Sequence, residues 1–128
     1  MKLILDTHTY VWWLIKDNQL SQHAIDAIQD ESNQIFISSI VIWELMIKKS
    51  VKKLRFDIGT EQILSAYKNE VGFEELPITI EHATRVELLP FIHRDPFDRV
   101  LIAQALAEGA HLVTADAQIA QYDMPVIW

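Results

Sequence analysis

Short apolar runs alternate with longer amphipathic segments along the chain. The apolar runs at residues 3–5, 35–37, 73–78, 112–113 and 126–127 predict five strands, of which the last is the weakest. The segments between them predict helices over residues 21–31, 38–49, 60–71, 79–89 and 95–109. Strands that alternate with helices in this way are typical of an α/β fold with a largely parallel sheet.

The helix predicted over residues 95–109 has the clearest boundaries. Asp95 can cap its first turn, Pro96 suits the first helical position, and Gly109 suits the residue after the last turn. Hydroxyl side chains are the predicted caps of the other helices: Ser21, Ser38 or Ser39, Thr60 and Thr79. The apolar face predicted for the helix over residues 60–71 consists of Ile63, Leu64, Tyr67 and Val71.

The composition is that of an ordinary globular domain. Half of the 128 residues are hydrophobic, and the length predicts a single domain over residues 1–128. The absence of cysteine excludes disulfide scaffolds, thiolate zinc sites and cysteine nucleophiles. No apolar run is long enough to span a bilayer, and Asp6 interrupts the N-terminal apolar run before a signal peptide could form. We therefore expect a soluble, cytoplasmic protein without a membrane partner.

Acidic residues fall at the predicted carboxyl ends of strands and at the amino ends of helices. In a parallel sheet with right-handed crossovers these ends share one edge, where such folds build their sites. Carboxylates held close together repel one another unless a cation neutralises them, and a hard divalent ion such as Mg²⁺ prefers oxygen ligands. Such an ion can activate a bound water for phosphodiester hydrolysis. The acids that we expect at this edge are Asp6, Glu44, Asp95, Asp98 and Asp116.

Each acid also has an interpretation that needs no metal. Asp6 and Asp95 would cap helices, and Asp98 at the third helical position would favour the helix dipole or close a capping box with Asp95. Asp116 would be a turn residue. Glu44 would form a solvent-facing i,i+4 pair on its helix. Its predicted partner is Lys48, and the predicted apolar face of that helix consists of Ile40, Trp43 and Ile47.

At these residues the chain resembles the PIN-domain ribonucleases of the VapC toxin type. The likeness rests on an ordered set of pieces that extends from end to end: residues 5–8 (Leu-Asp-Thr-His), 43–45 (Trp-Glu-Leu) followed by Ile47-Lys48, 93–99 (His-Arg-Asp-Pro-Phe-Asp-Arg), 101–105 (Leu-Ile-Ala-Gln-Ala) and 114–116 (Thr-Ala-Asp). The stretch at 93–99 is distinctive of one subgroup.

The resemblance implies a fold, a site and partners. The fold would be a three-layer α/β/α sandwich with a parallel sheet in strand order 3-2-1-4-5. A Mg²⁺ or Mn²⁺ site would consist of Asp6 and Asp98 as core ligands, completed by Glu44 and Asp116. The supporting residues would be Thr7, Asp95 and Thr114, the last by hydrogen bonding. The family cleaves RNA in the cytoplasm as the toxin of a toxin–antitoxin pair, and its members are usually homodimers bound by a small antitoxin protein.

A cluster of basic residues interrupts the acidic chain, whose formal net charge of −7 comes from 18 acids and 11 bases. Five of the bases lie within eight residues: Lys48, Lys49, Lys52, Lys53 and Arg55. If the helix continues past residue 49, Glu44, Lys48, Lys52 and Arg55 share a face at i, i+4, i+8 and i+11. We predict that Lys48, Lys52 and Arg55 bind the RNA backbone; the alternative is a solvated surface.

Other functional classes fit the sequence less well. A haloacid-dehalogenase-like phosphatase needs a second Asp two positions after Asp6, where His8 stands, and a receiver domain needs a strand-end lysine that residues 112–116 lack. A zinc site is disfavoured because no two histidines have i,i+4 spacing. A PIN-like scaffold that only binds RNA or a protein remains the non-enzymatic alternative. The other candidate side chains have structural interpretations: His8 and His93 as hydrogen bonders at helix ends, and Trp12, Trp13 and Trp43 as core or dimer-interface aromatics.

Overall fold

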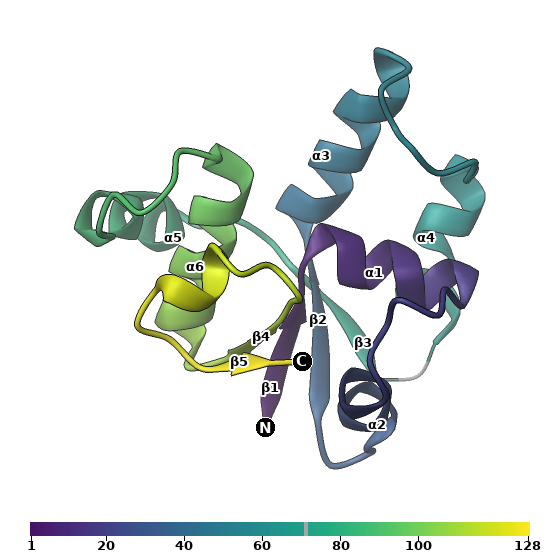
Figure 1. Ribbon diagram of the computed structural model, residues 1–128, viewed down its shortest axis with the longest axis horizontal. Coiled ribbons are helices and arrows are strands. Elements are labelled where there is room, and N and C mark those ends of the chain that lie inside the picture. The colour runs from purple at the N-terminus through teal and green to yellow at the C-terminus, as the bar shows by residue number, and fades with distance from the viewer. Residues whose placement is uncertain (71) are drawn as a thin grey trace.

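A computed structural model describes residues 1–70 and 72–128 and contains one five-stranded sheet (Figure 1). The strands are β1 (Lys2–Leu5), β2 (Gln34–Ser38), β3 (Phe73–Leu76), β4 (His111–Val113) and β5 (Val126–Ile127). All neighbouring strands are parallel, in the order β3-β2-β1-β4-β5. The predicted parallel sheet and its strand order are confirmed.

Helices cover the sheet on both sides, which confirms the predicted three layers. They are α1 (Thr7–Ile15), α2 (Gln22–Gln29), α3 (Ser39–Ser50), α4 (Thr60–Asn69), α5 (Ile80–Arg85) and α6 (Pro96–Glu108), with short 3₁₀ turns η1 (Val86–Leu88) and η2 (Ile119–Gln121). In Figure 1, α1, α2 and α4 lie to the right of the sheet and α5 and α6 to its left. Helix α3 contacts both α1 and α6.

The central strands form the core because both of their faces are covered. Leu3, Ile4 and Leu5 of β1 are completely buried, as are Leu112 and Val113 of β4. Continuous apolar runs are typical of strands in such a sheet. At the upper edge of the sheet in Figure 1, near the middle of the picture, the carboxyl ends of β1 and β4 lie side by side, where Leu5 pairs with Val113. The residues that follow these two strands are therefore brought together.

Side-chain caps begin several helices where the sequence predicts them. The side chains of Ser21, Ser38, Thr79 and Asp95 accept hydrogen bonds from the first turns of α2, α3, α5 and α6. Helix α4 differs, because Thr60 is its first helical residue and Gly59 its cap, without a side-chain bond. Val71, which the sequence places on the apolar face of that helix, lies outside the described residues.

The length of helix α3 differs from the one on which the predicted basic face depends. It ends at Ser50, and Lys52 has a φ of 54°, a left-handed conformation that stops a right-handed helix. Lys53 then donates its backbone N–H to the carbonyl of Lys48 at 2.8 Å, which turns the chain back. The helix does not continue, so Lys52 and Arg55 do not share a helical face with Glu44.

The second correction concerns the buried face of α3. Trp43 is 57% exposed and Ile47 37% exposed, whereas Glu44 is buried beside Ile40 and Leu45. The predicted apolar face was therefore wrong for Trp43 and Ile47. Trp43 instead packs edge-on against Phe97 of α6, with ring centroids 5.7 Å apart.

Among the helices that the structure describes, none combines the length and the apolar character that a bilayer crossing requires.

Candidate active site

Asp6 lies at the junction between β1 and α1 and is almost completely buried. Its Oδ1 accepts a hydrogen bond from the backbone N–H of Thr9 at 2.8 Å, so Asp6 caps α1. Its Oδ2 accepts a hydrogen bond from the hydroxyl of Thr114. Burial raises the pKa of the Asp6 carboxyl, although these hydrogen bonds lower it. The cap interpretation is therefore correct, and it leaves a buried carboxylate at the sheet edge.

Thr114 joins Asp6 to Asp116. The Thr114 hydroxyl donates to Asp6 and accepts the backbone N–H of Asp116 at 3.0 Å. The carboxylate of Asp116 accepts the backbone N–H of Gln118 at 2.8 Å, so it also stabilises the turn after β4. The supporting role that the resemblance implies for Thr114 has a direct hydrogen-bond basis.

Asp98 lies in the first turn of α6, where Asp95 supplies the cap. Asp95 Oδ1 accepts the backbone N–H groups of Phe97 and Asp98 at 2.9 and 3.2 Å. The Asp98 carboxylate instead contacts His93, with Oδ2 and Nε2 3.1 Å apart. Burial raises the pKa of Asp98 to about 6; the charges of Asp95 and Asp116 act in the same direction, and the His93 hydrogen bond opposes them. Asp98 therefore lies within electrostatic range of Asp116.

Glu44 connects to the same edge through Thr7. The Thr7 hydroxyl donates to Glu44 Oε1 at 2.7 Å, and Lys48 Nζ lies 2.6 Å from Glu44 Oε2. The i,i+4 pair expected from the sequence is thus present, but Glu44 is only 7% exposed. Breaking the pair would leave a buried carboxylate without its ammonium partner, so Lys48 helps to hold Glu44 in place.

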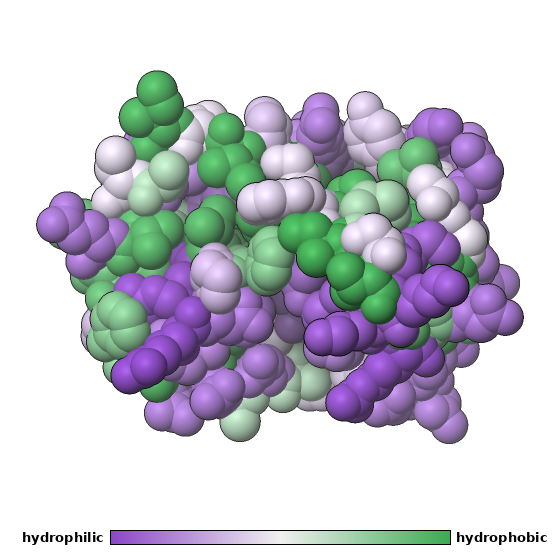
Figure 2. Space-filling view, turned by 90° about the horizontal axis from the view of Figure 1, so that it is seen from above, coloured by the Kyte–Doolittle hydropathy of each residue, from purple (hydrophilic) through white to green (hydrophobic). Residues whose placement is uncertain are grey.

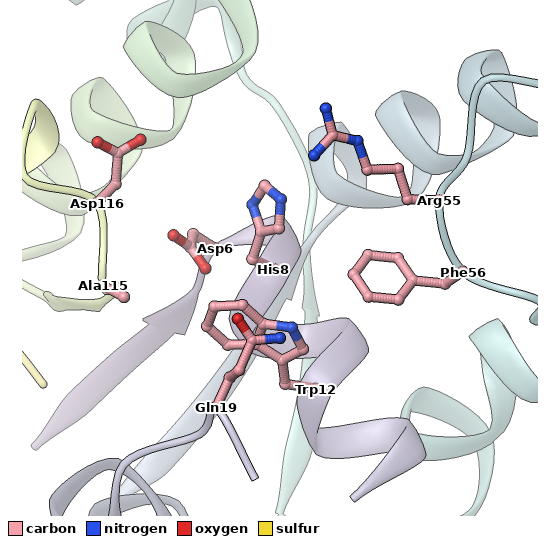
Figure 3. A pocket seen from close by; sticks show the side chains of 8 residues that line it. All are labelled: Asp6, His8, Trp12, Gln19, Arg55, Phe56, Ala115 and Asp116. Carbon is pink, nitrogen blue, oxygen red and sulfur yellow. The ribbon is translucent and has the colours of Figure 1, made fainter. Parts of the chain in front are cut away.

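A hollow of about 450 Å³ opens between the acids and the loop that follows α3. Figure 3 shows Asp6 and Asp116 at one side of the hollow and the guanidinium of Arg55 at the other, with His8 between them. Aromatic rings line its wall: the His8 ring lies 5.7 Å from Trp12 and 6.5 Å from Phe56, measured between centroids. The hollow therefore combines carboxylates, a cation and flat apolar surfaces.

A second hollow, of about 390 Å³, continues from the first. Both are lined by His8, Arg55 and Phe56, and the second adds Lys48 and Lys53. Figure 2 looks down on this end of the molecule and shows a recess near its middle, with hydrophilic side chains to its left and right and hydrophobic ones above it. Lys53 and Arg55 thus reach the hollows from the loop at residues 51–59, whereas Lys48 reaches the second hollow from α3.

The loop holds its shape through Lys49, which serves a structural purpose. Its Nζ donates to the carbonyl of Ile58 at 2.8 Å, joining the end of α3 to the far end of the loop. Lys52 lines neither hollow. Of the three bases that the sequence nominates for RNA, the structure brings Lys48 and Arg55 to the hollows and leaves Lys52 outside; Lys53 is there in its place.

The side chains at this edge offer the oxygen ligands that a hard divalent cation prefers. Carboxylate oxygens come from the four acids, and the hydroxyls that bond to them belong to Thr7 and Thr114. The four acids are Asp6, Glu44, Asp98 and Asp116. Within residues 1–70 and 72–128, however, no three acidic or histidine side chains stand close enough to share one ion. Asp6 and Asp116 line one hollow. The charge of Asp116 acts on Asp98, and Glu44 accepts a hydrogen bond from Thr7. A bound ion would have to draw these side chains together.

Three residues of this region escape sequence analysis or receive only a minor role in it. Phe56 and Lys53 line the hollows, yet a lone aromatic and one lysine among five give no periodic signal. Tyr122 reaches the region from the end of η2, and its hydroxyl lies 2.7 Å from His93 Nδ1. The sequence marks it only as an aromatic residue near the C-terminus.

Comparisons with known proteins show the family and the fold. The PIN domain matches residues 3–124. Ribonuclease VapC22 of Mycobacterium tuberculosis is 26% identical over 123 residues, which are 96% of this chain and 93% of that protein. The fold is similar to that of VapBC2 from Rickettsia felis bound to a promoter DNA fragment, with a TM-score of 0.70 and 21% identity over 98% of this chain and 97% of that chain. DNA-bound VapBC from Salmonella typhimurium gives a TM-score of 0.67 and 20% identity, over 98% and 96% of the two chains.

Proposed function

Because this chain belongs to the PIN-domain family, we propose that it is a metal-dependent endoribonuclease and the toxin of a toxin–antitoxin pair. The observation that carries the proposal is the linkage of Asp6 to Asp116 through Thr114, beside a hollow with Asp98 within electrostatic range. The similarity to Ribonuclease VapC22 over nearly the whole of both chains supports the assignment of RNA as substrate. The structural likeness to VapBC complexes is consistent with it.

In this proposal Asp6, Asp98 and Asp116, with Glu44, hold Mg²⁺ or Mn²⁺. Such an ion supplies an activated water and neutralises charge that develops on the scissile phosphate. Burial raises the pKa values of both Asp6 and Asp98, so without an ion the charged form of each carboxyl is disfavoured. A bound cation would favour the charged form, which is the physical reason to expect one here.

The chain's own side chains orient the acids and bind the strand. Thr114 holds Asp6, and Thr7 holds Glu44, so each carboxylate is already ordered before an ion draws the acids together. Arg55 faces the acids across the first hollow, and Lys53 extends the positive charge into the second. RNA phosphates next to the scissile one would bind these bases, since phosphate contacts position a strand without reading its sequence. We therefore assign Lys48, Lys53 and Arg55 to this role, and not Lys52.

The proposed partner is a small antitoxin protein, which would act in the cytoplasm where RNA and toxin meet. A basic antitoxin side chain placed at the acidic edge would substitute for the charge of the metal, which gives a specific, electrostatically complementary contact. A homodimer stays a prediction, to be checked by sedimentation of the purified chain.

The first test is cleavage of single-stranded RNA by the purified chain with Mg²⁺, with Mn²⁺ and with EDTA. We expect cleavage with either ion, none with EDTA, and a loss of at least ~100-fold in Asp6→Asn, which keeps the size of the side chain but removes a ligand charge. Asp57→Asn, at an exposed acid that lines neither hollow, is the matched control and should cleave normally. Cleavage at the same rate with and without EDTA would contradict the proposed metal dependence.

The second test addresses the toxin role. Expression of the chain alone should arrest growth, and the Asp98→Asn form should be harmless. Melting temperature then separates a nuclease from an inert scaffold: divalent ions should raise it in the wild type and EDTA should reverse the effect. A chain that cleaves RNA in vitro yet is benign at high expression would instead be a housekeeping nuclease.

A further inference from the structure

A buried cation lies behind the acidic edge, at Arg99 of α6. Arg99 is 6% exposed, and its Nη1 donates to the carbonyl of Pro90 at 3.0 Å and to the hydroxyl oxygen of Tyr122 at 3.1 Å. Its Nη2 reaches the carbonyl of Val86 at 3.3 Å, and its guanidinium lies 4.5 Å from the centroid of the Phe91 ring. Among the described residues, no carboxylate lies within 4 Å of the Arg99 nitrogens. The positive charge is held by neutral groups alone.

Tyr122 connects this cation to His93. A phenol oxygen has two acceptor positions and one proton. Arg99 Nη1 and the backbone N–H of His93, at 3.4 Å, both donate to that oxygen and fill the acceptor positions. The Tyr122 proton must therefore go to the remaining neighbour, His93 Nδ1, at 2.7 Å. The opposite assignment would direct three donors at one oxygen and leave the phenol proton without a partner.

The direction of this first bond determines the second. Since Nδ1 of His93 accepts, the ring proton of neutral His93 is on Nε2, which lies 3.1 Å from Asp98 Oδ2. We propose that Arg99, Tyr122 and His93 form a positioning relay that fixes this His93 tautomer and so orients the Asp98 carboxylate, with Oδ2 engaged and Oδ1 free to bind a divalent ion. The role of the relay in RNA cleavage rests on the function proposed above.

The relay does more than stabilise the start of α6. Asp95 already accepts the backbone N–H groups of Phe97 and Asp98, so the helix needs no second cap from Asp98. The His93 ring is buried, so water cannot reorient it freely. A group that hydrogen-bonds the non-coordinating atom of a metal ligand orients that ligand, and its removal typically lowers metal affinity or activity by about 10–100-fold.

The test begins with the tautomer, read from ¹⁵N chemical shifts of the histidine rings in the metal-free chain. We expect His93 to carry its proton on Nε2, with Nδ1 unprotonated. Tyr122→Phe removes the donor to Nδ1 and should shift His93 toward the other tautomer or a mixture. Tyr10→Phe is the matched control, because it removes a buried tyrosine hydroxyl that donates to Ile63, far from His93 in the sequence. A protonated Nδ1 in the wild type would overturn the proposal.

The consequence for the site is measured by Mn²⁺ binding, followed by calorimetry without RNA. His93→Gln keeps a donor toward Asp98 and should bind Mn²⁺ nearly as the wild type does, whereas His93→Phe keeps bulk without a donor and should bind ~10–100-fold more weakly. Equal affinity in both variants, each shown to be folded by circular dichroism, would refute a positioning role.

With RNA as substrate, His93→Phe should lower kcat while leaving KM nearly unchanged. Because the tautomer and Mn²⁺ measurements use no RNA, they test the relay even if RNA is not the substrate. A failure of the RNA assay alone therefore contradicts the proposed function and not the relay.

Discussion

The sharpest prediction concerns the stability of the metal-free chain as a function of pH, with and without the Asp98 carboxyl. The pKa of Asp98 rises from 3.8 to about 6 on folding, chiefly because of burial. Well below pH 3.8 the carboxyl is protonated in both the folded and the unfolded chain and does not affect their balance. Between about pH 4 and pH 6 the unfolded chain releases this proton while the folded chain keeps it, so stability falls as the pH rises; above pH 6 the carboxyl is ionised in both states and the loss is complete.

The size of the loss follows from the shift. About two pKa units at ~1.36 kcal/mol each give an upper bound of about 3 kcal/mol. The Asp98 side chain keeps 22% of its exposure, and solvent screening reduces the bound, so we expect about 1–2 kcal/mol. Asp98→Asn is neutral and can still accept the Nε2–H of His93, so it should escape this loss.

The assay is urea unfolding in EDTA at intervals from pH 3.5 to pH 8. The stability of the variant relative to the wild type should increase between about pH 4 and pH 6, and the difference should become constant above that range. Asp57→Asn, which neutralises an exposed acid, should show no such gain. A free-energy difference between wild type and Asp98→Asn that does not change with pH would refute the reasoning, because it would show that the Asp98 carboxyl is as easily ionised folded as unfolded.

Two further predictions concern Thr114 and the basic residues of the loop after α3. Thr114→Val removes the hydroxyl that joins Asp6 to the turn after β4, and urea unfolding at pH 7 should show a loss of about 1–3 kcal/mol, since a buried acceptor loses its donor; an unchanged midpoint would contradict this. Arg55→Gln combined with Lys53→Gln should flatten the log–log salt dependence of RNA binding by up to ~1.4 units, at ~0.7 per phosphate contact. Lys52→Gln should leave the slope unchanged, and an equal effect would mean that the RNA follows another surface.

Local sequence signals predict the sheet and the helix starts well. The apolar runs of β1 and β4 need no tertiary information, because a strand covered on both faces is apolar at every position. Asp95, Pro96 and Gly109 fix the ends of α6 through short-range hydrogen bonds and backbone geometry. The acids followed from topology, since strand ends and helix starts share one edge.

Predictions that depend on the environment of a segment were less successful. Helix α3 carries apolar side chains around most of its circumference, so its sequence does not reveal which face the sheet will cover; Trp43 is exposed and Glu44 is buried. Nothing between residues 50 and 55 is a glycine or proline, yet Lys52 adopts a left-handed conformation and the loop returns to α3. The contact of Lys49 with Ile58 that holds this loop is tertiary.

The relay behind Asp98 was beyond sequence analysis for a related reason. Arg99 and His93 are five or fewer residues from Asp98, but Tyr122 joins them from the other end of the chain. A histidine near an acid suggests a hydrogen bond without indicating which ring nitrogen makes it. Only the packing of η2 against the segment before α6 determines the direction of each bond.

The central claim is that the acids at the sheet edge activate a water to hydrolyse RNA, and the chemistry of the RNA ends tests it most directly. A defined single-stranded RNA is incubated with the chain and Mg²⁺ or Mn²⁺, and the products are examined by mass spectrometry. Attack by water leaves linear monophosphate ends, whereas attack by the ribose 2′-hydroxyl leaves a 2′,3′-cyclic phosphate. We predict linear ends only, absent in EDTA and in Asp98→Asn. Cyclic phosphate ends, formed equally well in EDTA, would contradict the account.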